Sequence, residues 1–185
     1  MLVLVGASGT GKTAIRNYLI SNYQMNKVIS CTTRTMREGE VDGQDYFFLQ
    51  KEEFEHRIQK DWFVEYTQYN DNYYGIPKHQ IKDNSIAIVE PDGVASLKKQ
   101  EDINLTIIYL QSLSSVRKER MKKRGDTDEQ ILQRIETDDL RFKSVKEQAD
   151  CIVDNDGNSI EDVAKFVYNL YNIENKLKTI KLEVE

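Results

Sequence analysis

The chain has 185 residues, of which 39% are hydrophobic and 31% charged, and it contains nine glycines and two prolines. This composition fits one globular domain that can bury a full hydrophobic core, and it excludes a disordered or fibrous chain. The 26 basic and 31 acidic residues give a net charge of −5, which argues against nucleic acid as a partner.

The cysteines and the first apolar run indicate the cellular compartment in which the protein works. Cys31 and Cys151 are too few and too far apart for a disulfide framework or a pair of metal ligands. The first apolar run reaches a glycine at position 6, so it is too short for a signal segment or a membrane span. We therefore expect a cytoplasmic protein without a membrane partner. Monomer and homodimer both remain open.

Short apolar runs typical of buried strands lie at residues 2–5, 28–31, 86–89, 105–110 and 151–153. Helical patterns separate most of them, and this alternation predicts an α/β fold with a parallel five-stranded sheet flanked by helices. We assign residues 1–31, 81–115 and 144–185 to this core. A helix with one apolar face should start near Asn158 or Ser159 and include Val163, Val167 and Tyr171, leaving 173–185 as a tail.

A glycine-rich segment follows the first predicted strand and precedes a helical pattern. Its spacing, G-x4-G-K-[ST], lets backbone N–H groups surround phosphates at a helix N-terminus. Lys12 would reach the β- and γ-phosphates of ATP, and Thr13 would coordinate Mg²⁺. The residues predicted to bind ATP here are Gly6, Ala7, Ser8, Gly9, Thr10, Gly11, Lys12 and Thr13. The alternative is a glycine-rich turn that contains Lys-Thr by chance.

Two segments interrupt the alternation of strands and helices. Residues 32–80 hold five of the ten tyrosines and contain strand-like pieces at 46–49 and 63–69, which predicts a small, mostly β insertion. Residues 116–143 begin with six basic residues in the eight of 117–124 and are interrupted at Gly125. We expect two exposed helices there that form a mobile lid, although most charge runs are simply solvated helix faces.

Several stretches resemble one family. Residues 30–48 read SCTTRTMREGEVDGQDYFF, residues 63–66 read FVEY and residues 72–75 read NYYG. They are similar to the GMP-binding signature of guanylate kinases. With the glycine-rich loop, the basic segment and residues 152–156, the resemblance covers essentially the whole chain in the family's order. It implies an enzyme that transfers the γ-phosphoryl group of ATP to GMP or dGMP.

The resemblance also implies a role for each matching residue. Ser30 and Glu65 would read the guanine, and Glu90 would supply a carboxylate near Mg²⁺ or the guanine amine. The GMP phosphate would be bound by Arg34, Arg37, Tyr46 and Tyr74, consistent with the bidentate contacts that guanidinium groups make to phosphate. The lid arginines Arg120, Arg124 and Arg134 would act in catalysis together with Lys12. Asp154 would lie at the adenine.

The chain departs from the family pattern at a few positions. Ile76 stands where a serine or threonine is usual, which predicts one lost hydroxyl contact to GMP. Ile88 and Glu90 replace two acidic residues, and the segment after Arg124 is one residue short. The substitutions leave open another P-loop kinase, acting on a different nucleoside monophosphate or a phosphorylated ribose. A non-catalytic guanylate-kinase-like binding module is a further alternative, although such modules lack a working phosphate loop.

Overall fold

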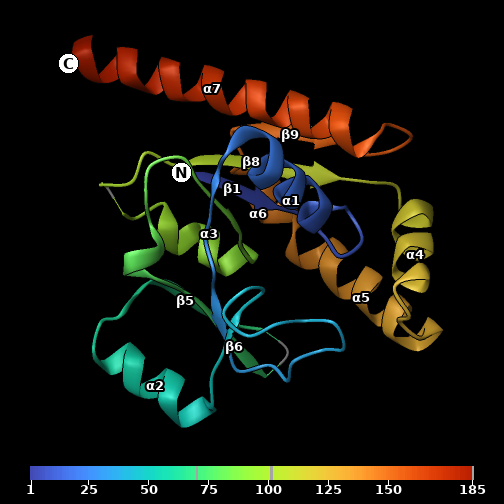
Figure 1. The fold of residues 1–185 in the computed structure, drawn as a ribbon. Coiled ribbons are helices and arrows are strands. Elements are labelled where there is room, and N and C mark those ends of the chain that lie inside the picture. The colour runs from blue at the N-terminus through green and yellow to red at the C-terminus, as the bar shows by residue number, and fades with distance from the viewer. Residues whose placement is uncertain (70, 101, 185) are drawn as a thin grey trace.

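The computed structural model describes residues 1–69, 71–100 and 102–184, with side chains up to residue 180. Within these residues the chain forms two sheets and the helices around them (Figure 1). The five-stranded sheet is parallel and has the strand order β2-β7-β1-β8-β9. Its strands are β1 (Leu2–Val5), β2 (Asn26–Lys27), β7 (Ser85–Ile88), β8 (Thr106–Gln111) and β9 (Cys151–Asp154). The predicted α/β class and parallel sheet are confirmed.

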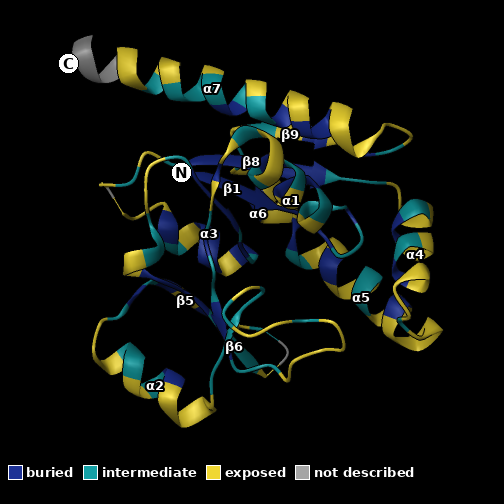
Figure 2. Cartoon of the chain, in the orientation of Figure 1, coloured by how far each residue is buried: buried dark blue, intermediate teal, exposed yellow. Residues whose placement is uncertain are grey.

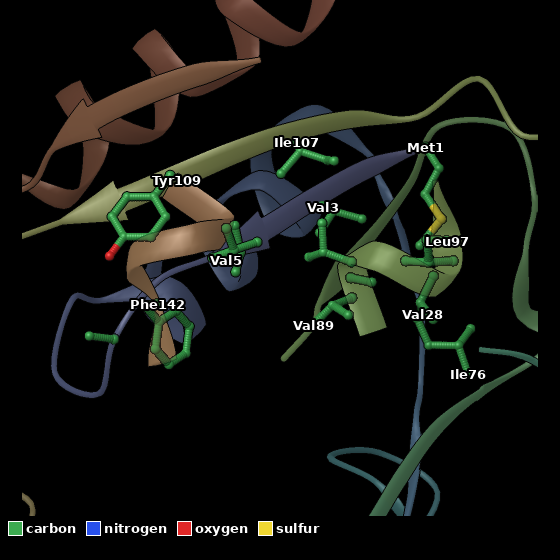
Figure 3. Packing of buried hydrophobic residues seen from close by; sticks show 14 residues of the cluster. Met1, Val3, Val5, Val28, Ile76, Val89, Leu97, Ile107, Tyr109 and Phe142 are labelled. Carbon is green, nitrogen blue, oxygen red and sulfur yellow. The ribbon is translucent and has the colours of Figure 1, made fainter. Parts of the chain in front are cut away.

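The central strand β1 divides the hydrophobic core into two layers, because successive side chains on a strand point to opposite faces. Val3 and Val5 join a cluster with α3 (Pro91–Leu97) and α6 (Lys143–Glu147) on one face, as Figure 3 shows for part of that cluster. Leu2 and Leu4 pack on the other face against α1 (Lys12–Tyr23) and α7 (Ile160–Val184). The buried residues therefore concentrate on and around this sheet (Figure 2).

A second, mixed sheet has the strand order β4-β3-β6-β5. It consists of β3 (Cys31–Thr32), β4 (Phe47–Phe48), β5 (Phe63–Tyr69) and β6 (Asn72–Pro77), and α2 (Lys51–Gln59) packs on it through Phe54. A short 3₁₀ helix, η1 (Lys78–Gln80), returns the chain toward β7. This sheet and α2 lie at the lower end of the molecule in Figure 1, away from α7.

The basic segment forms two helices, α4 (Ser114–Lys123) and α5 (Asp128–Arg141), as predicted. Gly125 separates them with a φ of +94°, a left-handed conformation that glycine adopts without strain. Thr127 then starts α5 with a capping box, in which its side chain and that of Gln130 each accept the other residue's backbone N–H. Gly125 thus ends one helix and Thr127 begins the next.

Two element boundaries differ from the sequence-based prediction. The strand expected at 28–31 is divided, because the chain leaves β2 of the parallel sheet at Lys27 and enters the second sheet at Cys31, which pairs with Gly75. The expected tail from residue 173 is wrong, since α7 continues through Val184. Its start is as predicted, with the Ser159 hydroxyl accepting the N–H of Asp162 at 3.1 Å.

Candidate active site

The phosphate loop, residues 6–13, connects the end of β1 to α1. Gly9 and Gly11 have φ values of +81° and +92°, which L side chains rarely adopt. A Cβ atom on Gly11 would also lie 2.4 Å from Nδ2 of Asn155. Asn155 is buried after β9 and donates from this nitrogen to the Thr10 carbonyl at 2.8 Å. The Asn155 side chain therefore supports the loop, a role that differs from the place at the adenine which the resemblance implies for residues 154–156.

The start of α1 offers a cation and free backbone donors at this loop. Lys12 donates from Nζ to the carbonyls of Gly6 at 2.5 Å and Ala7 at 2.9 Å. Burial lowers the pKa of Lys12 to about 8, although the negative charges of Glu90 and Asp138 act in the opposite direction. The helix has no side-chain N-cap bond, and Thr13 is exposed in its first turn. Such a terminus favours an anion.

The three predicted lid arginines occupy different positions. Arg120 donates to the carbonyls of Gly9 at 3.3 Å and Asn155 at 2.7 Å, so it braces the phosphate loop from the side. Arg124 pairs with Asp126 and its side chain is about half exposed. Arg134 lines a hollow between α5 and the end of β5, together with Tyr69, Gln130, Gln133 and Thr137. Only Arg120 touches the phosphate loop in this arrangement.

A second group of cations gathers on the loop between β3 and β4. Arg34 bonds to Glu40 at 2.7 Å and lies 5.5 Å from the ring centroid of Tyr46. The Tyr46 and Tyr74 rings meet edge to face at 6.2 Å. Burial lowers the pKa of Arg37, and three other guanidinium groups lower it further, those of Arg34, Arg134 and Arg124. The predicted phosphate-binding residues and two of the lid arginines therefore form one positive region.

Two carboxylates belong to the predicted acceptor site, of which Glu65 is buried and Glu90, just before α3, is partly exposed. Glu65 on β5 is 5% exposed, and its Oε2, like that of Glu90, has no hydrogen-bond partner among the described residues. Burial and the charge of Glu90 raise the pKa of Glu65 to about 8. Burial also raises the pKa of Glu90, whereas the nearby Lys12 lowers it. A Cβ on Gly93 would lie 2.4 Å from Glu65 Oε2, so this glycine of α3 makes room for the carboxylate.

Two further residues predicted for the site, Ser30 and Asp154, make few contacts with the rest of it. Ser30 is half-buried, and its carbonyl accepts the N–H of Phe47 at 2.9 Å between β3 and β4. Asp154 is exposed at the end of β9 and accepts from Gln111 at 2.7 Å, whereas the adjacent Asn155 points to the phosphate loop. Sequence analysis missed Asp138, which is buried on α5 and contacts Ser8 of the loop.

Ile76 does not lie where the missing hydroxyl was expected. Its side chain is fully buried with Val28, Val94 and Leu97 in the core cluster of Figure 3, and only its backbone reaches the site, through a hydrogen bond that lowers the Glu65 pKa. A serine hydroxyl at this position would face apolar side chains. The isoleucine that replaces the family's usual serine or threonine at position 76 therefore packs in the hydrophobic core.

Ile76→Ser is therefore expected to destabilise the protein by about 3 kcal/mol or more, because it leaves a cavity and buries a hydroxyl. Urea unfolding followed by circular dichroism measures the change. Ile76→Val is the matched control and should cost only about 0.5–1.5 kcal/mol. Unchanged stability together with a lower KM for GMP would support the sequence-based expectation of a hydroxyl contact instead.

The raised pKa of Glu65 predicts a pH-dependent stability. The pKa of this carboxyl group is 4.5 in the unfolded protein, so below that pH both the folded and the unfolded protein carry the proton. Between pH 4.5 and about 8 the unfolded protein has lost the proton and the folded protein still holds it. The free energy of unfolding therefore falls as the pH rises through this range. Glu65→Gln removes this effect. We expect the variant's Tm to exceed the wild-type Tm at pH 9 and the difference to shrink toward pH 5, as measured by calorimetry. A difference that does not depend on pH would contradict the assignment.

Two features are absent from the residues that the structure describes. No helix among them is long and apolar enough to cross a membrane. Within the same residues, no group of three or more histidine, cysteine, aspartate or glutamate side chains has an arrangement that could hold a metal ion.

Comparison with known proteins agrees with the geometry. The sequence profile of guanylate kinases matches residues 1–172. A guanylate kinase of Aster yellows witches'-broom phytoplasma (strain AYWB) is 38% identical over 168 residues, covering 84% of this chain and 78% of the relative. That of Onion yellows phytoplasma (strain OY-M) is 37% identical over 166 residues, with the same coverage.

A solved structure has the same fold. The crystal structure of guanylate kinase from Anaplasma phagocytophilum superposes with a TM-score of 0.74 at 24% identity, covering 95% of this chain and 85% of that one. The profile match extends over the phosphate loop, both sheets and the helices α4 and α5. The chain belongs to the guanylate kinase family.

Proposed function

We propose that this protein phosphorylates GMP, and dGMP, with ATP as donor and Mg²⁺ as its cofactor. The observation that carries the proposal is the sequence of charges from Lys12 through Glu90 to Glu65. Lys12 lowers the pKa of Glu90, and Glu90 raises that of Glu65, so the three groups are neighbours. Glu90 therefore lies between the cation of the phosphate loop and a buried carboxyl group whose Oε2 has no hydrogen-bond partner among the described residues.

The acceptor fits this carboxylate by its hydrogen-bonding edge. Guanine presents an N1–H and an exocyclic amine side by side, and an ionised Glu65 can accept from both, with Ser30 near O6. Buried polar groups require such partners. The positive region formed by Arg34 and Arg37 with Tyr46 and Tyr74 would hold the GMP phosphate through charge-assisted bonds. The acceptor oxygen would thus face the phosphate loop.

The donor side follows from the loop and the start of α1. Backbone N–H groups of residues 9–13 would bind the ATP phosphates, and Lys12 would leave the carbonyls of Gly6 and Ala7 to neutralise charge on the transferred group. The exposed Thr13 hydroxyl and the Glu90 carboxylate, which lies 3.7 Å from Arg141 Nη1, are the kinds of ligand that Mg²⁺ takes. When bound, Mg²⁺ would offset phosphate charge. Asp154 and Asn155 would lie at the adenine end.

Three parts of the chain would divide this work. The core consists of residues 1–31, 81–115 and 144–185, the insertion of residues 32–80 would bind GMP, and residues 116–143 would act as a lid that brings Arg124 and Arg134 over the phosphates. Arg120 would support the loop from its present place. Closure would exclude water, which matters because a bound γ-phosphate can otherwise be hydrolysed. We place the reaction in the cytoplasm.

A coupled assay of ADP release with GMP, dGMP, AMP, CMP and UMP tests the proposal. The expected result is fast turnover with the two guanine nucleotides and little with the others. Preference for another nucleoside monophosphate would keep the phosphate loop but overturn the guanine assignment. An absence of turnover with every acceptor, despite ATP binding, would overturn catalysis itself.

A further inference from the structure

Both polar backbone groups of Ser8 in the phosphate loop are held by side chains of α4 and α5. The Ser8 N–H donates to Oδ2 of Asp138 at 2.6 Å, and the Ser8 carbonyl accepts from Nε of Arg117 at 2.9 Å. The next residue is equally constrained, because a Cβ on Gly9 would lie 2.7 Å from the Arg117 carbonyl oxygen. The outer side of the loop is therefore fixed by the two helices that follow β8.

The residues that make these contacts are charged and buried. Asp138 is 1% exposed and Arg117 is 4% exposed, with Oδ2 and Nη2 3.7 Å apart. Arg117 also pairs through Nη1 with the exposed Asp139 at 2.6 Å. A buried ion pair contributes little net stability, because removing both charges from water is unfavourable. A role in positioning explains this pair better than a role in stability.

The second oxygen of Asp138 faces the sheet that carries Glu65. Tyr69, the last residue of β5, donates from its hydroxyl to Oδ1 at 3.4 Å. Arg141, one turn after Asp138 on α5, lies 4.2 Å from the centroid of the Tyr69 ring and bonds to Asp92 at 2.6 Å. Asp92 in turn accepts from Thr67 of β5 at 3.3 Å. Strand β5 is thus docked on α5 at the point where α5 holds the phosphate loop.

We propose that Asp138 is a positioning residue that couples acceptor binding to donor binding. Its Oδ1 accepts a hydrogen bond from Tyr69 at the end of β5, the strand that also carries Glu65. Its Oδ2 accepts the N–H of Ser8, the residue just before the backbone amides proposed to bind phosphate. When a nucleoside monophosphate orders β5 against α5, Asp138 fixes Ser8 and the loop binds ATP more tightly. The inference rests on the proposed function of the two subsites, and by linkage ATP must strengthen acceptor binding by the same factor.

Calorimetric binding of a non-hydrolysable ATP analogue, alone and with saturating GMP, measures this coupling. The ratio of the two dissociation constants should be about fivefold or more in the wild-type protein. It should fall to near one in Asp138→Asn, which keeps the size of the side chain but removes its charge. Tyr69→Phe, which removes only the hydroxyl, should lower the ratio to less than half and leave binding of the analogue alone unchanged. Combining the two variants should produce no further loss.

Asp139→Asn is the matched control, because it removes a partner of the same Arg117 without touching Ser8, and its ratio should equal that of the wild type. A wild-type ratio of one, or wild-type ratios in both Asp138→Asn and Tyr69→Phe, would overturn the proposal. The same titration with AMP, CMP and UMP separates it from the guanine assignment. Coupling driven by another nucleotide would overturn that assignment alone, and fast GMP turnover without coupling would overturn the role of Asp138 alone.

Discussion

Lys12→Met is expected to lower kcat for GMP phosphorylation by about 10³-fold, because it removes a cation aimed at the charge that develops during transfer. The methionine keeps much of the length and apolar contact of the lysine stem. Its circular dichroism spectrum and Tm should therefore stay close to those of the wild type. Steady-state assays of ADP release, with ATP and GMP both saturating, measure the effect on kcat.

Lys122→Met is the control for the loss of one lysine. Lys122 lies on α4, is largely exposed and pairs with Asp128 at 3.3 Å, and exposed pairs contribute little to stability. Its turnover should equal that of the wild type. If Lys12→Met retained near-normal kcat, the phosphate loop would not be the site of transfer, and the catalytic function would have to be abandoned.

The second large effect concerns the base. Glu65→Ala should lower kcat/KM for GMP by an amount that corresponds to a loss of about 2–4 kcal/mol in transition-state stabilisation, since two donors on guanine would lose their buried acceptor. Above pH 8, where Glu65 is ionised, wild-type enzyme should prefer GMP over AMP by about 10⁴-fold, because adenine would place a lone pair at N1 against the carboxylate. IMP keeps the N1–H but lacks the amine and should fall between them. Kinetic assays of both enzymes with each of the three purine nucleotides establish the order.

The pKa of Glu65 adds a signature to this result. A carboxyl group with a pKa of about 8 is mainly protonated in the free enzyme at neutral pH, whereas guanine requires the ionised form. Hence kcat/KM for GMP should rise with pH up to about 8 and then level off. Glu52→Ala, at an exposed position on α2, should leave both the rate and the pH profile unchanged. A flat profile in the wild-type enzyme would contradict the assignment of Glu65.

The parts of the fold that follow from local rules could be predicted from the sequence. Strand β1 is an apolar run, and the spacing of the glycines after it is typical of a phosphate-binding loop between a strand and a helix. Gly125 likewise marks the break between α4 and α5. The transfer of the chain between sheets after Lys27 could not be predicted. It depends on the pairing of Cys31 with Gly75, which is a long-range contact.

The site divides in the same way. Lys12 and Glu65 follow from a motif and a resemblance, and the structure brings Glu90 near each of them. Asp138 has no such signal, because it lies in a run of acidic residues on a charged helix where a solvated position is the usual expectation. Its burial arises only when the ends of α5, β5 and the phosphate loop meet. Sequence periodicity carries no information about that junction.

The position of β1 in the sheet has a consequence for the synthesis of the protein. This first strand lies between β7 and β8, and α1 packs against α7, with Tyr23 and Tyr168 stacked at 4.1 Å. The partners of the N-terminal segment are therefore translated long after it, and such non-local contacts slow folding. A growing chain exposes its glycine-rich loop before the loop has any fixed shape. Nucleotide binding should consequently be acquired only when the C-terminal helix has left the ribosome.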